Sequence, residues 1–176
     1  MATGPTKDLG PCVLEWGGTD LGKTHGGCKF RYSEEDAGVF EDQQGTDSID
    51  DIIVGGPTEF EAPLTRTQLS VLAALMAGAT GSGTSGTTMT IKATVGVSRY
   101  DRAQELIIKP VLENGGADPN TSTWLHIFKA SPKANYELAY DNTGQRVYNT
   151  MFKGYSDQTT TGIAALRKWR IGPAIA

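Results

Sequence analysis

Residues 17–24 read GGTDLGKT, and they fit the phosphate-binding loop pattern G-x-x-x-x-G-K-[ST] at every position. In such a loop the backbone amides wrap the phosphates of a nucleotide, the lysine reaches the terminal phosphates, and the last hydroxyl holds magnesium. The matching residues here are Gly17, Gly22, Lys23 and Thr24. The first chemistry to consider is therefore the binding or hydrolysis of a nucleoside triphosphate.

The residues that follow this segment argue against a nucleotide site. A phosphate loop leads into a helix, because the N-terminus of that helix points its amides at the phosphates. Here the sequence continues HGGCKFRYSEE, in which Gly26 and Gly27 each disfavour a helix by about 1 kcal/mol relative to alanine. Cys28, Phe30 and Tyr32 then alternate with basic residues, which is the period of a half-buried strand. We interpret residues 17–24 as a turn between two strands, with a nucleotide-binding or hydrolytic enzyme as the alternative.

No other set of residues has the pattern of a catalytic or metal-binding site. His25 and His126 are the only histidines, and they stand far apart in the chain. The acidic residues do not follow the spacing of a calcium-binding loop. We therefore expect no enzymatic activity, no cofactor and no metal ion.

Cys12 and Cys28 are the only cysteines, too few for a disulfide framework and without metal-ligand spacing. A free cysteine usually behaves as a small buried hydrophobic side chain. The alternative is oxidation after release from the cell, within one chain or between chains, which depends on the geometry of the two side chains. The pair is a candidate disulfide that the sequence alone does not decide.

Charge is divided unequally between the two halves of the chain. Residues 1–88 carry five basic and thirteen acidic side chains, whereas residues 89–176 carry eleven basic and seven acidic ones. Most of the acids in the first half lie in one segment, residues 33–51: Glu34, Glu35, Asp36, Glu41, Asp42, Asp47, Asp50 and Asp51. Such a segment is either a solvated loop or a surface that meets a basic partner. The net charge of −4 argues against a conventional nucleic-acid binder.

Alternating apolar residues predict a mainly β domain of antiparallel strands with one helix. The expected strands are residues 12–16, 28–32, 52–54, 59–62, 88–97, 105–111, 123–130, 136–140 and 147–155, the last two joined by the turn DNTGQR. The helix is expected to begin at Thr65, because Thr65 and Gln68 have the spacing of a capping box. Its apolar stripe would be Leu69, Leu72, Ala73 and Met76.

Three segments fall outside these elements. Residues 78–88, GATGSGTSGTT, have the composition of a flexible linker. Residues 33–51 form an acidic stretch of nineteen residues without a periodic pattern, which is long for a loop in a compact domain unless the loop is functional. The basic and aromatic C-terminal arm, about residues 159–176, is expected to dock through Arg167, Lys168 and Arg170 on its own sheet or on an acidic neighbour.

The length of 176 residues suits a single domain, which we expect to span residues 1–176. No apolar run has the length of a membrane span, and the opening MATGPTKD lacks the apolar core of a signal peptide. We therefore expect synthesis in a cytoplasm and no membrane insertion.

Short motifs of one known family occur in order along nearly the whole chain. The opening VLEWGGTDLGKTHGGCKFRY has a strand ending in Glu-Trp-Gly, then a Leu-Gly turn and a second strand. Near the other end stand FKASPKANYELAY and VYNTMFKGYSD, in which Phe152, Lys153, Tyr155 and Asp157 match a Phe-Lys-Ala-Tyr-Pro-Asp motif. Gly154 and Ser156 depart from that motif. In these features the chain resembles the bacteriophage major tail proteins.

The resemblance implies a β-sandwich or partial barrel with one flanking helix, which closes with identical subunits into hexameric rings. Stacked rings would form a tail tube whose lumen conducts double-stranded DNA from the capsid to the host without binding it specifically. In that family the long loop after the second strand reaches a neighbouring subunit or ring, so residues 33–51 are the stacking candidate. Rings need two different complementary surfaces on each subunit, which the acidic and basic halves would supply.

The resemblance also implies partners and a location. The partners would be further copies of the chain, the tape measure, terminator and baseplate proteins, and a sheath if the tail contracts. The location would be the virion tail, assembled in the cytoplasm of a bacterial host. Alternatives within the same class are a terminator, a baseplate tube-like protein or the tube of a phage-derived secretion device, and a further alternative is a monomeric β-sandwich binding module.

Overall fold

Antiparallel strands make up most of the part of the chain that the structure describes. The computed structural model describes residues 11–40, 47–65, 68–82, 88–112, 115–134, 146–159 and 166–173. The strands are β1 (Cys12–Trp16), β2 (Thr19–Asp20), β3 (Lys23–Thr24), β4 (Lys29–Tyr32), β5 (Glu35–Val39), β6 (Asp50–Gly55), β7 (Thr58–Thr65), β8 (Ala79–Ser82), β9 (Thr88–Ile91), β10 (Gln104–Pro110), β11 (Leu125–Ala134), β12 (Tyr148–Tyr155) and β13 (Trp169–Ile171). The helical elements are α1 (Leu69–Leu75) and the 3-10 turn η2 (Thr121–Thr123).

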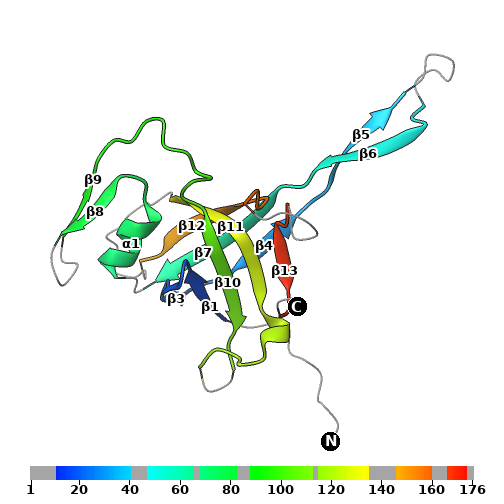
Figure 1. Ribbon diagram of the computed structural model, residues 1–176. Helices are drawn as coiled ribbons and strands as arrows, with labels where there is room; N and C mark the ends of the chain where they lie inside the picture. The colour runs from blue at the N-terminus through cyan, green and yellow to red at the C-terminus, as the bar shows by residue number, and fades with distance from the viewer. Residues whose placement is uncertain are drawn as a thin grey trace, which may run out of the picture.

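The main sheet curls into a half-barrel with the short helix α1 on one side (Figure 1). Its strands are hydrogen-bonded in the order β2-β1-β10-β11-β12-β7-β3, while β4 also pairs with β7 and β13 also pairs with β11. The pairings described in this sheet are antiparallel. The expected fold class, mainly β with a partial barrel and one flanking helix, is confirmed.

Alternate residues of the central strands face a common hydrophobic core, as the period-two pattern requires. On β7 the buried positions include Phe60, Ala62 and Leu64, and the residue opposite Phe60 on β12 is Phe152. Trp16 packs beside Phe152, and its indole N–H donates a 2.9 Å hydrogen bond to the carbonyl of Ala130 on β11. The core therefore joins strands from the beginning, the middle and the end of the chain.

The helix is shorter than its sequence pattern predicts, and its expected start is wrong. Thr65 is the last residue of β7, where it pairs with Lys23, and its hydroxyl donates to the Lys23 carbonyl over 3.5 Å. Gln68 is the N-cap residue, without a side-chain capping bond, so Thr65 and Gln68 form no capping box. Of the expected stripe, Leu72 and Ala73 are buried, but Leu69 is exposed. Val71 and Leu75 take its place in the core.

The two ends of the expected linker, residues 78–88, belong to paired strands, and residues 83–87 lie outside the described residues. Residues 79–82 and 88–91 form the two-stranded sheet of β8 and β9, in which Ala79 pairs with Ile91 and Ser82 with Thr88. The residues of β8, ATGS, have no apolar alternation, so the sequence pattern could not reveal that strand, whereas Met89 and Ile91 alternate with threonine in β9. The expected strand 88–97 correspondingly ends at Ile91.

The expected closing hairpin is only partly within the described residues. Strands β11 and β12 pair in antiparallel register from Lys129 with Tyr155 to Ala134 with Thr150. The expected strand 136–140 and most of the turn DNTGQR lie outside the described residues. Among the residues that are described, no helix is long and apolar enough to cross a bilayer.

The structure gives a steric reason for glycine at position 154, where the chain departs from the Phe-Lys-Ala-Tyr-Pro-Asp motif. A Cβ built on Gly154 would lie 2.9 Å from both Cβ and Cγ2 of Thr58 and 3.1 Å from Cγ2 of Ile127. These distances are too short for a methyl group at a buried crossing of three strands. The chain thus has a small residue at position 154 because Thr58 fills the space.

We expect Gly154→Ala to lower the free energy of unfolding by about 1–3 kcal/mol, the usual cost of overpacking a core. Urea unfolding of the variant measures the loss. The matched test is a double-mutant cycle with Thr58→Ser, which removes Cγ2 and should recover part of the loss. Strict additivity of the two changes would show that the contact with Thr58 is not the cause.

Candidate assembly surface

The acidic segment 33–51 is largely a β-hairpin that projects from the half-barrel, and the expectation of an irregular loop was wrong for its described residues (Figure 1). Strand β5 pairs with β6 in a register running from Glu35 with Gly55 to Val39 with Asp50. We call residues 33–40 and 47–55 the arm. Residues 41–46, which include Glu41 and Asp42, lie outside the described residues.

The arm is an extension of the paired strands β4 and β7. Their pairing ends with Tyr32 opposite Thr58, and the amide of Ser33 then donates to the carbonyl of Pro57 over 3.5 Å. A Cβ on Gly56 would lie only 2.7 Å from the Tyr32 ring, so the backbone of the arm's root packs directly on that side chain. Lys168 Nζ donates a 2.7 Å hydrogen bond to the Gly56 carbonyl. The root is therefore fixed to the body from two sides.

The arm exposes large apolar side chains on both of its faces. Consecutive residues of a strand point to opposite sides, so Ile52 and Ile53 lie on different faces. They are 55% and 62% exposed, and Val54 beside them is 64% exposed. Phe40 and Ile49 are also exposed toward the end of the arm. An unbroken apolar run such as IIV is typical of a strand that is covered on both faces.

The described acids of the arm are all exposed: Glu34, Glu35, Asp36, Asp47, Asp50 and Asp51. Within the described part of the chain none of their carboxylates forms a salt bridge with a basic side chain. Asp50 and Asp51 instead bond locally, with Asp51 Oδ1 accepting from the Ser48 hydroxyl at 3.0 Å. The arm thus presents apolar side chains surrounded by negative charge.

The described part of the C-terminal segment, residues 166–173, docks on its own sheet, one of the two expected arrangements. Strand β13 pairs with β11, from Leu125 opposite Ile171 to Ile127 opposite Trp169. The segment is turned back by the buried Asp157, whose amide donates to the Arg167 carbonyl at 2.8 Å. Trp169 then packs edge-on against Phe30 and Tyr32, with ring centroids 5.4 and 5.5 Å away.

The three expected basic residues of this segment make contacts within the chain. Arg167 and Arg170 lie over the ring of Phe128, with guanidinium carbons 4.7 and 5.3 Å from its centroid. Lys168 holds the root of the arm through Gly56. The basic segment and the acidic arm, distant in sequence, therefore meet at the root.

A shallow basic pocket of about 420 Å³ lies at this root. Its lining includes Tyr100, Lys153, Tyr155 and Lys168, together with one carboxylate, that of Glu35. Tyr100 and Tyr155 pack edge-to-face at 6.0 Å, and Lys153 Nζ lies 5.8 Å from the Tyr155 centroid. Two ammonium groups beside two aromatic rings can receive carboxylates and apolar side chains from another chain.

Sequence reasoning named the acids of the arm but missed its apolar residues and the basic pocket. The run DDIIVGG was the available signal, because it places three apolar residues between acids and glycines. No sequence pattern could bring Tyr100, Lys153 and Lys168 together, since they come from three separate parts of the chain.

The segment GGTDLGKT forms a hairpin turn followed by a strand. Gly17 and Gly18 have φ values of +56° and +80° and connect β1 to β2 as a two-residue turn, the geometry of a type I′ hairpin. The Asp20 carboxylate accepts from the amide of Gly22 at 2.9 Å. Lys23 and Thr24 then form β3, so no helix N-terminus follows the loop. The interpretation as a turn is confirmed for Gly17 and Gly18, whereas Thr19–Asp20 and Lys23–Thr24 are short strands.

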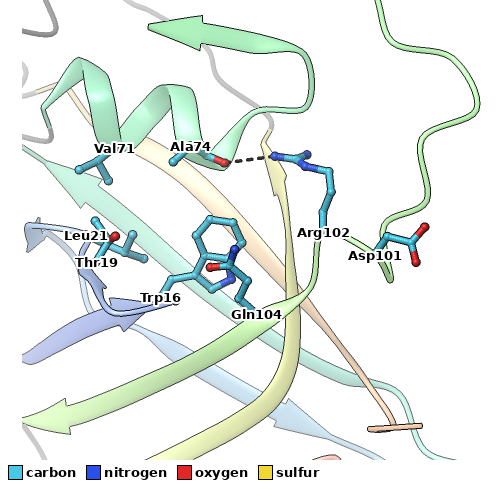
Figure 2. A pocket seen from close by; sticks show the side chains of 9 residues that line it. Trp16, Thr19, Leu21, Val71, Ala74, Asp101, Arg102 and Gln104 are labelled. Atoms are coloured by element: carbon cyan, nitrogen blue, oxygen red, sulfur yellow. Dashed lines mark hydrogen bonds between the residues drawn. The ribbon is translucent and has the colours of Figure 1, made fainter. Parts of the chain in front are cut away.

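A pocket of about 530 Å³ lies beside this turn, but the lysine of the phosphate-loop pattern does not line it (Figure 2). Its walls come from the turn, from α1 and from the start of β10, and include Trp16, Val71 and Gln104. Its only described basic group is Arg102, which donates a 3.1 Å hydrogen bond to the Ala74 carbonyl at the end of α1. The arrangement does not place Lys23 or Thr24 where phosphates would enter.

Saturating ATP and magnesium are therefore expected to leave the melting temperature unchanged. A ligand at a hundred times its dissociation constant adds about 2.7 kcal/mol of stability, which thermal unfolding detects easily. Magnesium alone is the control for ionic effects, and Lys23→Ala is the matched variant. A rise with ATP that Lys23→Ala removes would restore the nucleotide-binding alternative.

Two further polar side-chain contacts join neighbouring strands of the main sheet. His126 is buried on β11, and its Nδ1 lies 2.9 Å from Oε1 of Glu105 on the neighbouring β10. Lys109 pairs with Glu15 across β10 and β1. Among the described residues, no group of three or more histidines, cysteines and acids is placed to hold a metal ion.

Neither the known protein-family models nor the curated protein sequences give a match to this chain.

Proposed function

We propose that this protein is the structural subunit of a bacteriophage tail tube, assembling through its arm into stacked hexameric rings. The observation that carries the proposal is the arm, which exposes Ile52, Ile53 and Val54 among carboxylates at a distance from its own core. The lumen of the stacked rings conducts double-stranded DNA into the host. The subunit acts in the virion tail and works without catalysis or a cofactor.

The arm has the properties of an element that is completed by a partner. A two-stranded hairpin is marginally stable alone, and exposed apolar patches on monomers are usually binding surfaces. Burying one branched aliphatic side chain contributes about 1.5–3 kcal/mol, so covering the three apolar residues of β6 supplies ample energy for association.

A second copy of the chain fits as this partner because each copy carries a complementary surface. The carboxylates of the arm match the ammonium groups of Lys153 and Lys168 in the basic pocket of another copy. Arm and pocket are different surfaces, so the contact is heterologous, and such contacts build rings and tubes instead of closed dimers.

The fold and the charge balance support a conduit. A curled sheet with a flanking helix is the architecture that the resemblance to major tail proteins implies. A net charge of −4 suits a lumen through which DNA slides, because each phosphate paired with a basic side chain would add affinity. The tape measure, terminator and baseplate proteins, and a sheath in a contractile tail, would be its further partners.

Carbodiimide cross-linking of mixed isotopically light and heavy protein tests the contact. The reagent joins a carboxylate directly to a lysine amine, so peptides of the arm should link to the peptide containing Lys153. Links between light and heavy chains are expected at protein concentrations that give assembly, and Lys153→Gln should remove them. Arm peptides linked only within their own chain would contradict the proposal.

A further inference from the structure

Two cysteines lie at the seam of the half-barrel. The seam is the line along which β1, near one end of the main sheet, approaches β3 at the other end. Strand β1 lies near one end of the main sheet, whereas β3 and β4 pair with β7 at the other end. The amide of Leu21 extends the β1–β2 hairpin by donating to the carbonyl of Leu14 at 2.9 Å, and β3 begins at Lys23. Further along, Cys12 on β1 and Cys28, just before β4, place their sulfur atoms 3.2 Å apart.

The two thiols differ in reactivity because one donates a hydrogen bond to the other. The bond from Cys12 lowers the pKa of Cys28, and a second bond from the Thr24 hydroxyl acts in the same direction against the effect of burial. The same sulfur–sulfur bond raises the pKa of Cys12, and burial adds to that rise. Cys28 is thus the thiol that ionises first and acts as the nucleophile.

Both cysteines are half-buried, and Gly26 and Gly27 before Cys28 are exposed. Gly26 and Gly27 precede it with φ values of +86° each, and nothing lies within 4 Å of a Cβ built on either residue. The chain is therefore open beside Cys28, while the packing of both cysteines against the core holds the sulfurs together.

We propose that Cys12 and Cys28 are a modification site that forms an intramolecular disulfide, fastening β1 to the start of β4 and closing the seam. The oxidant is a low-molecular-weight disulfide such as glutathione disulfide. The site is independent of the proposed function, because it requires only the fold of one chain.

The reaction proceeds by two exchanges. The Cys28 thiolate attacks one sulfur of glutathione disulfide, forming a mixed disulfide and releasing one glutathione thiolate. Cys12 then loses its proton to solvent, and its sulfur attacks the Cys28 sulfur and expels the second glutathione thiolate. In total the two cysteines lose two electrons and two protons. The glutathione disulfide gains both and becomes two molecules of reduced glutathione.

Oxidation of the purified protein with glutathione disulfide tests the site, with intact mass and thermal unfolding as readouts. We expect the wild-type chain to lose its two thiol hydrogens without gaining glutathione. Closing a loop of this length, sixteen residues from Cys12 to Cys28, should raise the melting temperature by about 6–12 °C. Dithiothreitol should reverse both changes.

Single variants separate the roles of the two cysteines. Cys12→Ser should keep glutathione bound at Cys28, because the resolving thiol is gone, and should show no rise in melting temperature. Cys28→Ser should gain glutathione more slowly than Cys12→Ser, because burial still raises the pKa of Cys12 after the sulfur of Cys28 is removed. Linkage between chains, stable glutathione on the wild type, or an oxidised wild type of unchanged stability would each overturn the proposal.

A soft metal ion held by the two thiolates is the competing outcome. Incubation of the reduced protein with zinc or copper(I), followed by native mass spectrometry, distinguishes it. A metal retained by the wild type and lost in both single variants, with no disulfide formed by glutathione disulfide, would reject the disulfide in favour of a metal site.

Discussion

Replacing Ile52 and Ile53 together with serine is expected to abolish assembly while leaving the subunit folded. Both side chains stand on the arm, away from the hydrophobic core, and they cover its two faces. Burial of each contributes about 1.5–3 kcal/mol to a contact, so their loss should raise the protein concentration needed for assembly at least about a hundredfold. Sedimentation velocity over a concentration series measures this shift.

Val95→Ser is the matched control for the arm variant. Val95 is 97% exposed but lies outside the arm, so its replacement removes an exposed apolar side chain without touching the proposed contact. Circular dichroism and urea unfolding of both variants should resemble those of the wild type. An arm variant that assembles at wild-type concentrations would show that the arm does not join subunits.

Phe152→Ala is expected to lower the free energy of unfolding by about 3–5 kcal/mol, the range for removing a buried aromatic side chain. Phe152 is fully buried, and its ring lies 6.4 Å from that of Trp16 and 6.5 Å from that of Phe60. The variant leaves a cavity where β1, β7 and β12 meet. A decrease in the urea midpoint at constant slope measures the loss.

Phe40→Ala is the matched control, because it makes the same chemical change on the exposed arm. Its phenyl ring is 60% exposed, so the stability of the isolated subunit should change by less than about 0.5 kcal/mol. Equal losses in the two variants would contradict the placement of the core on the half-barrel and of Phe40 outside it.

The strands of the half-barrel could be predicted wherever one of their faces is buried. Strand β1 matches its expected range of 12–16, and β10 and β12 each differ from expectation by one residue at one or both ends. In these strands burial imposes a period of two on the sequence. The hairpin turn at Gly17 and Gly18 could also be predicted, because two consecutive glycines satisfy the positive φ values of such a turn.

Strands β5 and β8 and the start of the helix were missed, whereas β6 and β9 overlap the expected strands 52–54 and 88–97. Strand β5 does not bury one face against the core, so its sequence need not alternate. Thr65 has the right spacing for a capping box, but its pairing with Lys23 places it in a strand. The local sequence at Thr65 is compatible with a helix start or with a strand, and the pairing with β3 places Thr65 in β7.

The sequence predicted the negative charge of the arm but not the shape of the surface that the arm forms. The concentration of acids in residues 33–51 pointed to an interaction surface, whereas the projection of the arm depends on the pairing of β5 with β6. The basic pocket depends on the return of the C-terminal segment along β11, which places Lys168 against Gly56. Both features arise from contacts between segments that are distant in the sequence.

Negative-stain electron microscopy of the purified protein over a concentration series tests the central claim most directly. We expect hexameric rings at intermediate concentrations and hollow tubes at high concentrations, with tubes absent from the Ile52→Ser, Ile53→Ser variant. Compact single subunits at every concentration, with the arm intact, would contradict assembly through the arm and would support a monomeric binding module instead.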